Sequence, residues 1–168
     1  MKLVESNPAN FSVGRFGKLI IRGYFHRTAI RGDTAIGEGN YFHAHPVQAS
    51  AHYFIDLLGA VVQSVRDANT AYAVNQWVEN EISISIEFAG PEGTPLTSAQ
   101  IVSARNLIKT DPALKVLPLH RLTLAEILGE KVAGFGCHKD VTLAYKIAGG
   151  HTDNITESEI VEIFEGAK

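Results

Sequence analysis

The sequence predicts an α/β fold with a central mixed β-sheet flanked by helices. Residues 82–88 alternate strictly between large apolar and polar side chains, which is typical of a β-strand. Sequences of the form Thr-x-x-Gln or Thr-x-x-Glu, which cap helix N-termini, begin at Thr97, Thr123 and Thr156. Strand-like and helix-like segments interleave along the chain, which favours the α/β class.

The first half of the chain contains the strand signals. We expect a polar N-terminal arm over residues 1–17, followed by a short strand at residues 19–21 that leads through Tyr24 and Phe25 to His26. A glycine-rich stretch follows, with a short helix that ends near Tyr41-Phe42. Residues 51–58 predict a strand, Gly59 a turn, and residues 60–65 the antiparallel partner.

The second half contains the helix signals. Thr97 opens a helix that continues through Ile108 and is broken at Asp111-Pro112. A short helix is expected over 123–129, a β-like segment over 131–137, and a terminal helix from Thr156 through Phe164. The sequence has neither an internal repeat nor a linker, so we expect one domain over residues 1–168 with a core of roughly 15–155.

Composition limits the function classes. The chain has 168 residues, 45% of them hydrophobic, and a formal net charge of −3, so it lacks the basic character of a nucleic-acid-binding domain. A single cysteine, Cys137, excludes an internal disulfide. The first eight residues lack the apolar core of a signal peptide, and no apolar run reaches the length of a membrane span. We therefore expect a globular protein that is made in the cytoplasm and does not insert into membranes.

Two histidines and one aspartate form a candidate zinc site. His26 follows an apolar run, whereas His138 and Asp153 flank a segment in which Gly149-Gly150 lets the backbone turn. Three protein ligands leave a fourth position for water, which is the arrangement of a hydrolytic zinc. The alternatives are a surface histidine at position 26, and a helix-end histidine with a turn aspartate at the other two positions.

Glu87 is the candidate general base. It lies on the polar side of the alternating strand, where a carboxylate could exchange a proton with a zinc-activated water. A solvent-facing glutamate without a catalytic role is the alternative. Cys137 precedes His138, and neighbouring side chains on a strand point to opposite faces, so we interpret Cys137 as a small buried residue.

The remaining histidines carry weaker signals. His43 and His45 lie two residues apart without a third ligand nearby, so we expect a surface position, and His120 suggests no role. His52 lies on a predicted strand. It either faces the cleft, where it is the next candidate for the base, or has no catalytic role.

Several segments, in order along the chain, resemble the zinc-dependent N-acetylmuramoyl-L-alanine amidases of the peptidoglycan-recognition type, including bacteriophage endolysins. The most specific are Ser50-Ala51-His52-Tyr53 and the segments around the two distal zinc candidates. The matching segments are Leu19-Ile20-Ile21 with His26-Arg27-Thr28-Ala29, Tyr41-Phe42, residues 46–56, Val61-Val62-Gln63, Ser85-Ile86-Glu87 with Gly90, residues 96–100, residues 136–141 and Gly150-His151-Thr152-Asp153.

The resemblance implies a fold, an activity and a set of site residues. It implies the peptidoglycan-recognition fold, zinc bound by His26, His138 and Asp153, and catalysis by Glu87. His151 lies two residues before the last ligand, where relatives often have lysine, and would stabilise the oxyanion as a hydrogen-bond donor. The implied reaction is hydrolysis of the bond between N-acetylmuramic acid and the L-alanine of the stem peptide, which lyses the cell wall.

The same resemblance implies a catalytic domain without a wall-binding module, released to its peptidoglycan substrate by a holin-type pore. Three segments depart from the family pattern. Arg22-Gly23-Tyr24-Phe25, before His26, is more polar than usual. Ala71-Tyr72-Ala73 replaces the usual tryptophan–histidine pair, and Asn154-Ile155 replaces the usual proline and glycine after Asp153. A non-catalytic peptidoglycan-binding receptor on the same fold is the main alternative, and a zinc hydrolase that cuts another amide is a third.

Overall fold

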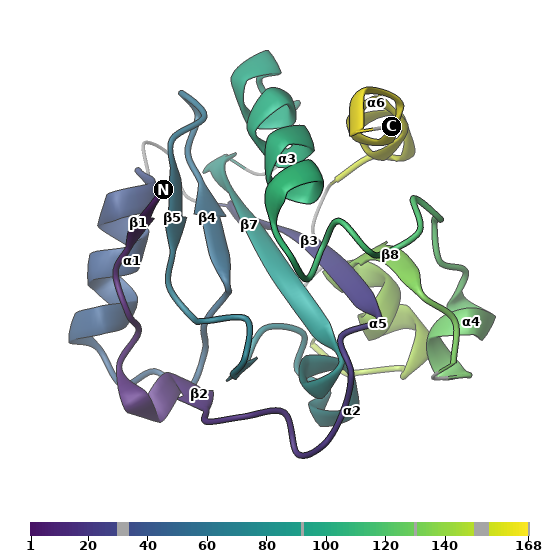
Figure 1. Cartoon of the computed structure of the whole chain (residues 1–168), viewed down its shortest axis with the longest axis horizontal. Helices are drawn as coiled ribbons and strands as arrows, with labels where there is room; N and C mark the ends of the chain where they lie inside the picture. The colour runs from purple at the N-terminus through teal and green to yellow at the C-terminus, as the bar shows by residue number, and fades with distance from the viewer. Residues whose placement is uncertain (30–33, 92, 130, 150–154, 168) are drawn as a thin grey trace.

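The computed structural model describes residues 1–29, 34–91, 93–129, 131–149 and 155–167, which form a mixed β-sheet with helices on both faces (Figure 1). The main sheet has six strands in the order β1-β5-β4-β7-β3-β8. Its strands are β1 (Lys2–Leu3), β3 (Arg22–Ala29), β4 (Tyr53–Ile55), β5 (Val61–Gln63), β7 (Ser83–Pro91) and β8 (Gly134–Cys137). Only the β4–β5 pair is antiparallel among these neighbours. The predicted α/β class and mixed sheet are confirmed.

The helices cover the sheet unequally. The helical segments are η1 (Pro8–Asn10), α1 (Ala35–Ala44), α2 (Trp77–Glu81), α3 (Ser98–Thr110), α4 (Leu124–Leu128), α5 (His138–Ala144) and α6 (Glu157–Ala167), and a small second sheet pairs β2 (Phe11–Ser12) with β6 (Thr70–Ala71). Helices α3 and α6 contact each other and lie together over one face of the main sheet (Figure 1).

Alternation along the central strands divides the core into two sides. Ile84, Ile86 and Phe88 of β7 belong to the large cluster that includes the apolar residues of α3 and α6. On the other face, Phe54 packs with residues of α1, and Tyr24 packs with residues of α4 and α5. Helices α1 and α5 thus cover the two ends of this second face, and the middle of the face is left for the cleft described below.

The three predicted capping boxes are confirmed. The side chains of Thr97 and Thr123 each accept a hydrogen bond from the third helical residue, whose side chain accepts one in return. At the third box, the amide of Thr156 donates to the carboxylate of Glu159, and the amide of Glu159 donates back to the threonine hydroxyl. The hairpin is also confirmed, although its strands are shorter than expected, with Tyr53 opposite Gln63.

Strand β3 begins and ends later than the sequence suggested. Residues 19–21 precede the strand, and His26 lies inside β3 rather than after it. Arg22 begins the strand with its side chain fully buried, because its guanidinium donates to both carboxylate oxygens of Glu79 at 2.7 and 2.6 Å. A buried charge is tolerated when it is paired in this way.

Two short α-helices, α2 and α5, were not predicted. In α5, the amide of Cys137 donates to the carboxylate of Asp140 at 2.6 Å, so this aspartate caps the helix that starts at His138. In α2, Glu79 is buried against Arg22, a contact across 57 residues that no local pattern reveals. In the part of the chain that the structure describes, no helix is long and apolar enough to cross a membrane.

Candidate active site

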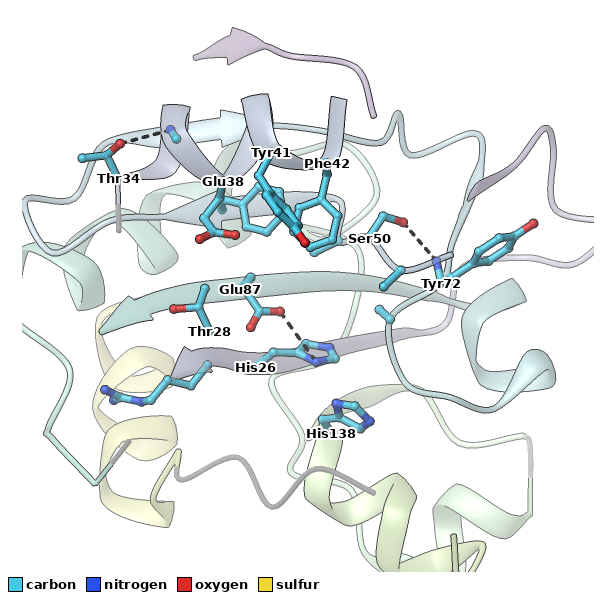
Figure 2. Close-up of a pocket in the computed structure, with 16 residues that line it drawn as sticks. His26, Thr28, Thr34, Glu38, Tyr41, Phe42, Ser50, Tyr72, Glu87 and His138 are labelled. Atoms are coloured by element: carbon cyan, nitrogen blue, oxygen red, sulfur yellow. Dashed lines mark hydrogen bonds and ion pairs between the residues drawn. The ribbon is translucent and has the colours of Figure 1, made fainter. Parts of the chain in front are cut away.

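Two adjacent parallel strands place His26 beside Glu87. The two residues are direct partners in the β3–β7 register, and Phe54 on β4 is the partner of Glu87 on its other side. Side chains at paired positions lie on the same face of a sheet. His26 Nδ1 lies 4.0 Å from Glu87 Oε2, and Figure 2 shows both side chains on the same side of the strands.

His26 and Glu87 form a row of side chains across the sheet, and His138, which follows β8, extends this row on the other side of β3. Cys137, the last residue of β8, pairs with Phe25, so His138 follows at the level of His26 and starts α5. The centroids of the two imidazole rings are 5.0 Å apart, and both histidines are buried. Residues separated by more than 100 positions are therefore brought together by the order of the strands.

The donor chemistry of this pair fits zinc, for which imidazole nitrogen is a preferred ligand. Within the described ranges, no group of three or more histidine, cysteine, aspartate or glutamate side chains could hold a metal ion. Asp153 and His151, the other two residues of the predicted site, lie outside the described residues. The structure brings His26, His138 and Glu87 together.

The row forms part of the lining of a cleft with a volume of about 610 Å³. Helix α1 supplies one wall through Glu38, Tyr41 and Phe42, which lie across the cleft from His26 and Glu87 in Figure 2. The sequence did not identify Glu38 as a cleft residue, because only the packing of α1 against the sheet brings it there. For Tyr41 and Phe42, the available signal was that both belong to a segment that resembles the family.

Glu87 and Glu79, eight positions apart in the sequence, have different surroundings. Its side chain is 18% exposed and lines the cleft, whereas the side chain of Glu79 is fully buried in an ion pair with Arg22. Glu87 can therefore contact a ligand in the cleft, whereas Glu79 serves only to neutralise the buried charge of Arg22.

His52 is buried, and both of its ring nitrogens have hydrogen-bond partners in the protein. Its Nδ1 accepts a hydrogen bond from the amide of Ser85, and its Nε2 lies 2.8 Å from the guanidinium of Arg15. Burial, with the nearby charge of Arg15, lowers the pKa of His52 to about 3. The side chain is not part of the lining of the 610 Å³ cleft. His52 is therefore buried in hydrogen bonds beside the cleft, and this position gives no support to a role as the base.

Cys137 and the surface histidines behave as expected. Cys137 is fully buried, and burial raises the pKa of its thiol, which disfavours the thiolate that binds metals. His43 and His45 are exposed and contact the carbonyl oxygens of Glu5 and Tyr41.

A family model described as N-acetylmuramoyl-L-alanine amidase matches residues 21–154, which include every residue of the predicted site. No curated protein sequence matches the chain.

Solved structures share the fold at low sequence identity. The Staphylococcus aureus hydrolase AmiA, solved in complex with its ligand, is similar with a TM-score of 0.72 and 15% identity, covering 99% of this chain and 83% of AmiA. A selenomethionine derivative of AmpD is similar with a TM-score of 0.63 and 18% identity, and the match covers 96% of this chain and 93% of AmpD. The endolysin LysCS from Clostridium intestinale URNW, an N-acetylmuramoyl-L-alanine amidase, is similar with a TM-score of 0.57 and 17% identity. The match covers 95% of this chain and 92% of LysCS.

Proposed function

Because the chain belongs to the N-acetylmuramoyl-L-alanine amidase family, we propose that it uses one zinc ion to hydrolyse the amide between N-acetylmuramic acid and the L-alanine of the peptidoglycan stem peptide. The observation that carries this proposal is the row of His26, Glu87 and His138 at the floor of the cleft. The row combines two of the three protein ligands that a hydrolytic zinc requires with a carboxylate that can exchange a proton.

His26 and His138, together with Asp153, would hold the zinc. The closeness of the two imidazoles supports the first two assignments, and the family resemblance supports the third. When bound, zinc supplies a Lewis acid that polarises the amide carbonyl and makes water more acidic.

Glu87 would move the proton. Its carboxylate lines the cleft 4.0 Å from the ring of His26, so it can accept a proton from a water held beside this histidine. The same carboxylate then delivers the proton to the amide nitrogen, which leaves as the amino group of L-alanine. His151 would donate a hydrogen bond to the oxygen of the carbonyl under attack, a role that rests on the resemblance alone.

Hydrolysis of this bond would detach stem peptides from the glycan and so weaken the cell wall. The main sheet and its covering helices support a single catalytic unit. The alternative is a receptor that binds peptidoglycan on the same fold without cutting it.

Metal analysis combined with a wall-clearing assay separates the enzyme from the receptor. The enzyme is expected to bind about one zinc per chain and to reduce the turbidity of a cell-wall suspension, with the activity lost in chelator and restored by zinc. Bound zinc without clearing at any enzyme concentration, and without release of soluble peptide, would favour the receptor.

A further inference from the structure

Three charged side chains that the proposed mechanism does not use meet beside the start of the helix that begins at His138. Asp140 lies in α5, two residues after His138, and is buried. Arg121 precedes α4, and Glu157 is the first residue of α6. Their contacts therefore join the helix of one proposed zinc ligand to two other parts of the chain.

One carboxylate oxygen of Asp140 accepts two hydrogen bonds. The backbone amide of Cys137 donates to Oδ2 at 2.6 Å, and the guanidinium of Arg121 donates to the same atom at 2.8 Å. Cys137 is the last residue of β8 and has extended backbone angles, φ −116° and ψ 161°, so the chain changes from strand to helix at the next residue. Asp140 thus fixes the residue from which His138 continues.

Arg121 is itself held at both its backbone and its side chain. The residues on either side of it exchange backbone hydrogen bonds with Phe135 of β8 at 2.8 and 2.9 Å. The Nε and Nη2 atoms of its guanidinium donate to the carboxylate of Glu157 at 3.0 and 2.8 Å. Charge-assisted contacts made by a planar guanidinium are directional as well as strong. The carboxylate of Asp140 therefore meets a partner whose position is already determined.

The two proposed histidine ligands differ in how their backbones are fixed. His26 lies inside β3, which is hydrogen-bonded to β7 on one side and to β8 on the other. His138 instead starts a helix of seven residues, and a helix of this length is not stable by itself. A metal ion binds tightly when its ligands are held near their final geometry before it arrives. For His138, the contacts of Asp140 can supply this constraint.

We propose that Asp140 is a positioning residue for zinc binding, which holds His138 beside His26 through the Cys137 amide, and that Arg121 keeps Asp140 in place. The inference rests on the proposed function, because His138 is a zinc ligand only in that proposal. A helix cap without this role would stabilise the fold and leave the metal affinity of the folded protein unchanged.

Binding of cobalt(II) to the metal-free protein tests the proposal without turnover, because the visible absorption of this ion depends on its coordination geometry. Asp140→Ala is expected to weaken cobalt affinity by roughly 10- to 100-fold, the usual effect of losing a contact behind a metal ligand, and to alter the spectrum. Asp140→Asn should restore most of the affinity, because its amide oxygen can still accept from the Cys137 amide and from Arg121.

Thr97→Ala is the matched control. It removes a side-chain cap from α3, which carries no proposed ligand. We expect it to lower the urea midpoint of the metal-free protein, as Asp140→Ala does, while cobalt affinity and spectrum stay at the wild-type level. If Asp140→Ala does not fold, Arg121→Gln decides, since it removes the guanidinium and leaves the Asp140–Cys137 contact; a severalfold loss of affinity is expected.

Wild-type cobalt affinity and spectrum in Asp140→Ala, or in Arg121→Gln where that variant decides, would overturn the proposal. Equal losses of affinity in Asp140→Ala and Thr97→Ala would do the same, because they would show a general effect of stability. Cobalt binding by the wild-type protein without cleavage of peptidoglycan would contradict the proposed amidase function alone, so the two failures are distinguishable.

Discussion

Glu79 and Glu87 lie eight positions apart, yet their surroundings give them opposite uses. Glu79 accepts hydrogen bonds from Arg22, Tyr24 and Tyr145 and has no exposed side-chain surface. Glu87 lines the cleft beside His26. A carboxylate that must exchange protons with a ligand has to be reachable, so the second environment suits catalysis and the first suits structure.

The change Glu87→Gln is expected to leave zinc content at the wild-type level while kcat falls by roughly 10² to 10⁴, the usual contribution of a general base. The amide keeps the size of the side chain but cannot take the proton. Steady-state kinetics on a muramyl peptide, with zinc measured on the same sample, check this. A kcat within threefold of wild type would show that the base lies elsewhere.

The change Asp153→Ala is expected to remove most of the bound zinc, because two histidines alone form an incomplete hydrolytic site. Zinc per chain after dialysis is the measurement. Asn154→Ala is the matched control, since this neighbouring amide is not in the proposed ligand set and its loss should leave zinc in place. Full zinc occupancy in Asp153→Ala would remove this residue from the site.

At the scale of elements, local signals predicted the structure well and distant contacts did not. The three capping boxes and the alternation of β7 involve residues a few positions apart, and each was confirmed. The true start of β3 depends on burial of Arg22 by Glu79, a contact between distant residues. Likewise, the sequence placed His52 on a strand, whereas β4 begins one residue later at Tyr53, and it could not reveal Arg15 as a neighbour of His52.

The Arg22–Glu79 pair links β3 to α2, and we expect its disruption to destabilise the protein. Glu79→Gln leaves the buried guanidinium without its counter-charge, which costs about 3 kcal/mol of unfolding free energy. Urea denaturation measures the change. Glu162→Gln on α6, part of an exposed pair with Arg105, is the control and should stay within about 1 kcal/mol. Equal stabilities of the two variants would contradict a structural role for Glu79.

The hydroxyl of Tyr53 on β4 lies 2.7 Å from the carboxylate of Asp67 and 2.7 Å from the carboxylate of Asp111, which ends α3. This contact links the β4–β5 hairpin to the end of α3. Burial raises the pKa of Asp67 from 3.8 to about 6; the hydrogen bond from Tyr53 opposes the shift, and the Asp111 charge adds to it. A raised pKa in the folded state means that this group favours folding below pH 4, and that the contribution is lost as the pH rises through 6.

Asp67→Asn should therefore become more stable relative to wild type as the pH rises from 4 to 7, because the amide keeps the acceptor for Tyr53 without the charge. Urea denaturation at several pH values measures this difference. A difference that stays constant over this range, or that decreases, would contradict the assignment.

At the scale of the whole molecule, the strand order creates the site. Placing β7 and β3 side by side, with β8 next to β3, brings His26, Glu87 and His138 into one row, while α1 and α5 leave the cleft open above it. The family resemblance anticipated the members of the row. The wall opposite the row was not anticipated, because Glu38 reaches the cleft only through the packing of α1 against the sheet.

The central claim is cleavage between N-acetylmuramic acid and L-alanine, and mass analysis of the fragments released from purified peptidoglycan tests it most directly. We predict soluble stem peptides with a free amino group on L-alanine, and glycan strands whose N-acetylmuramic acid carries a free carboxyl group. Release of sugars still joined to peptides, or of peptides cut at an internal bond, would contradict the account.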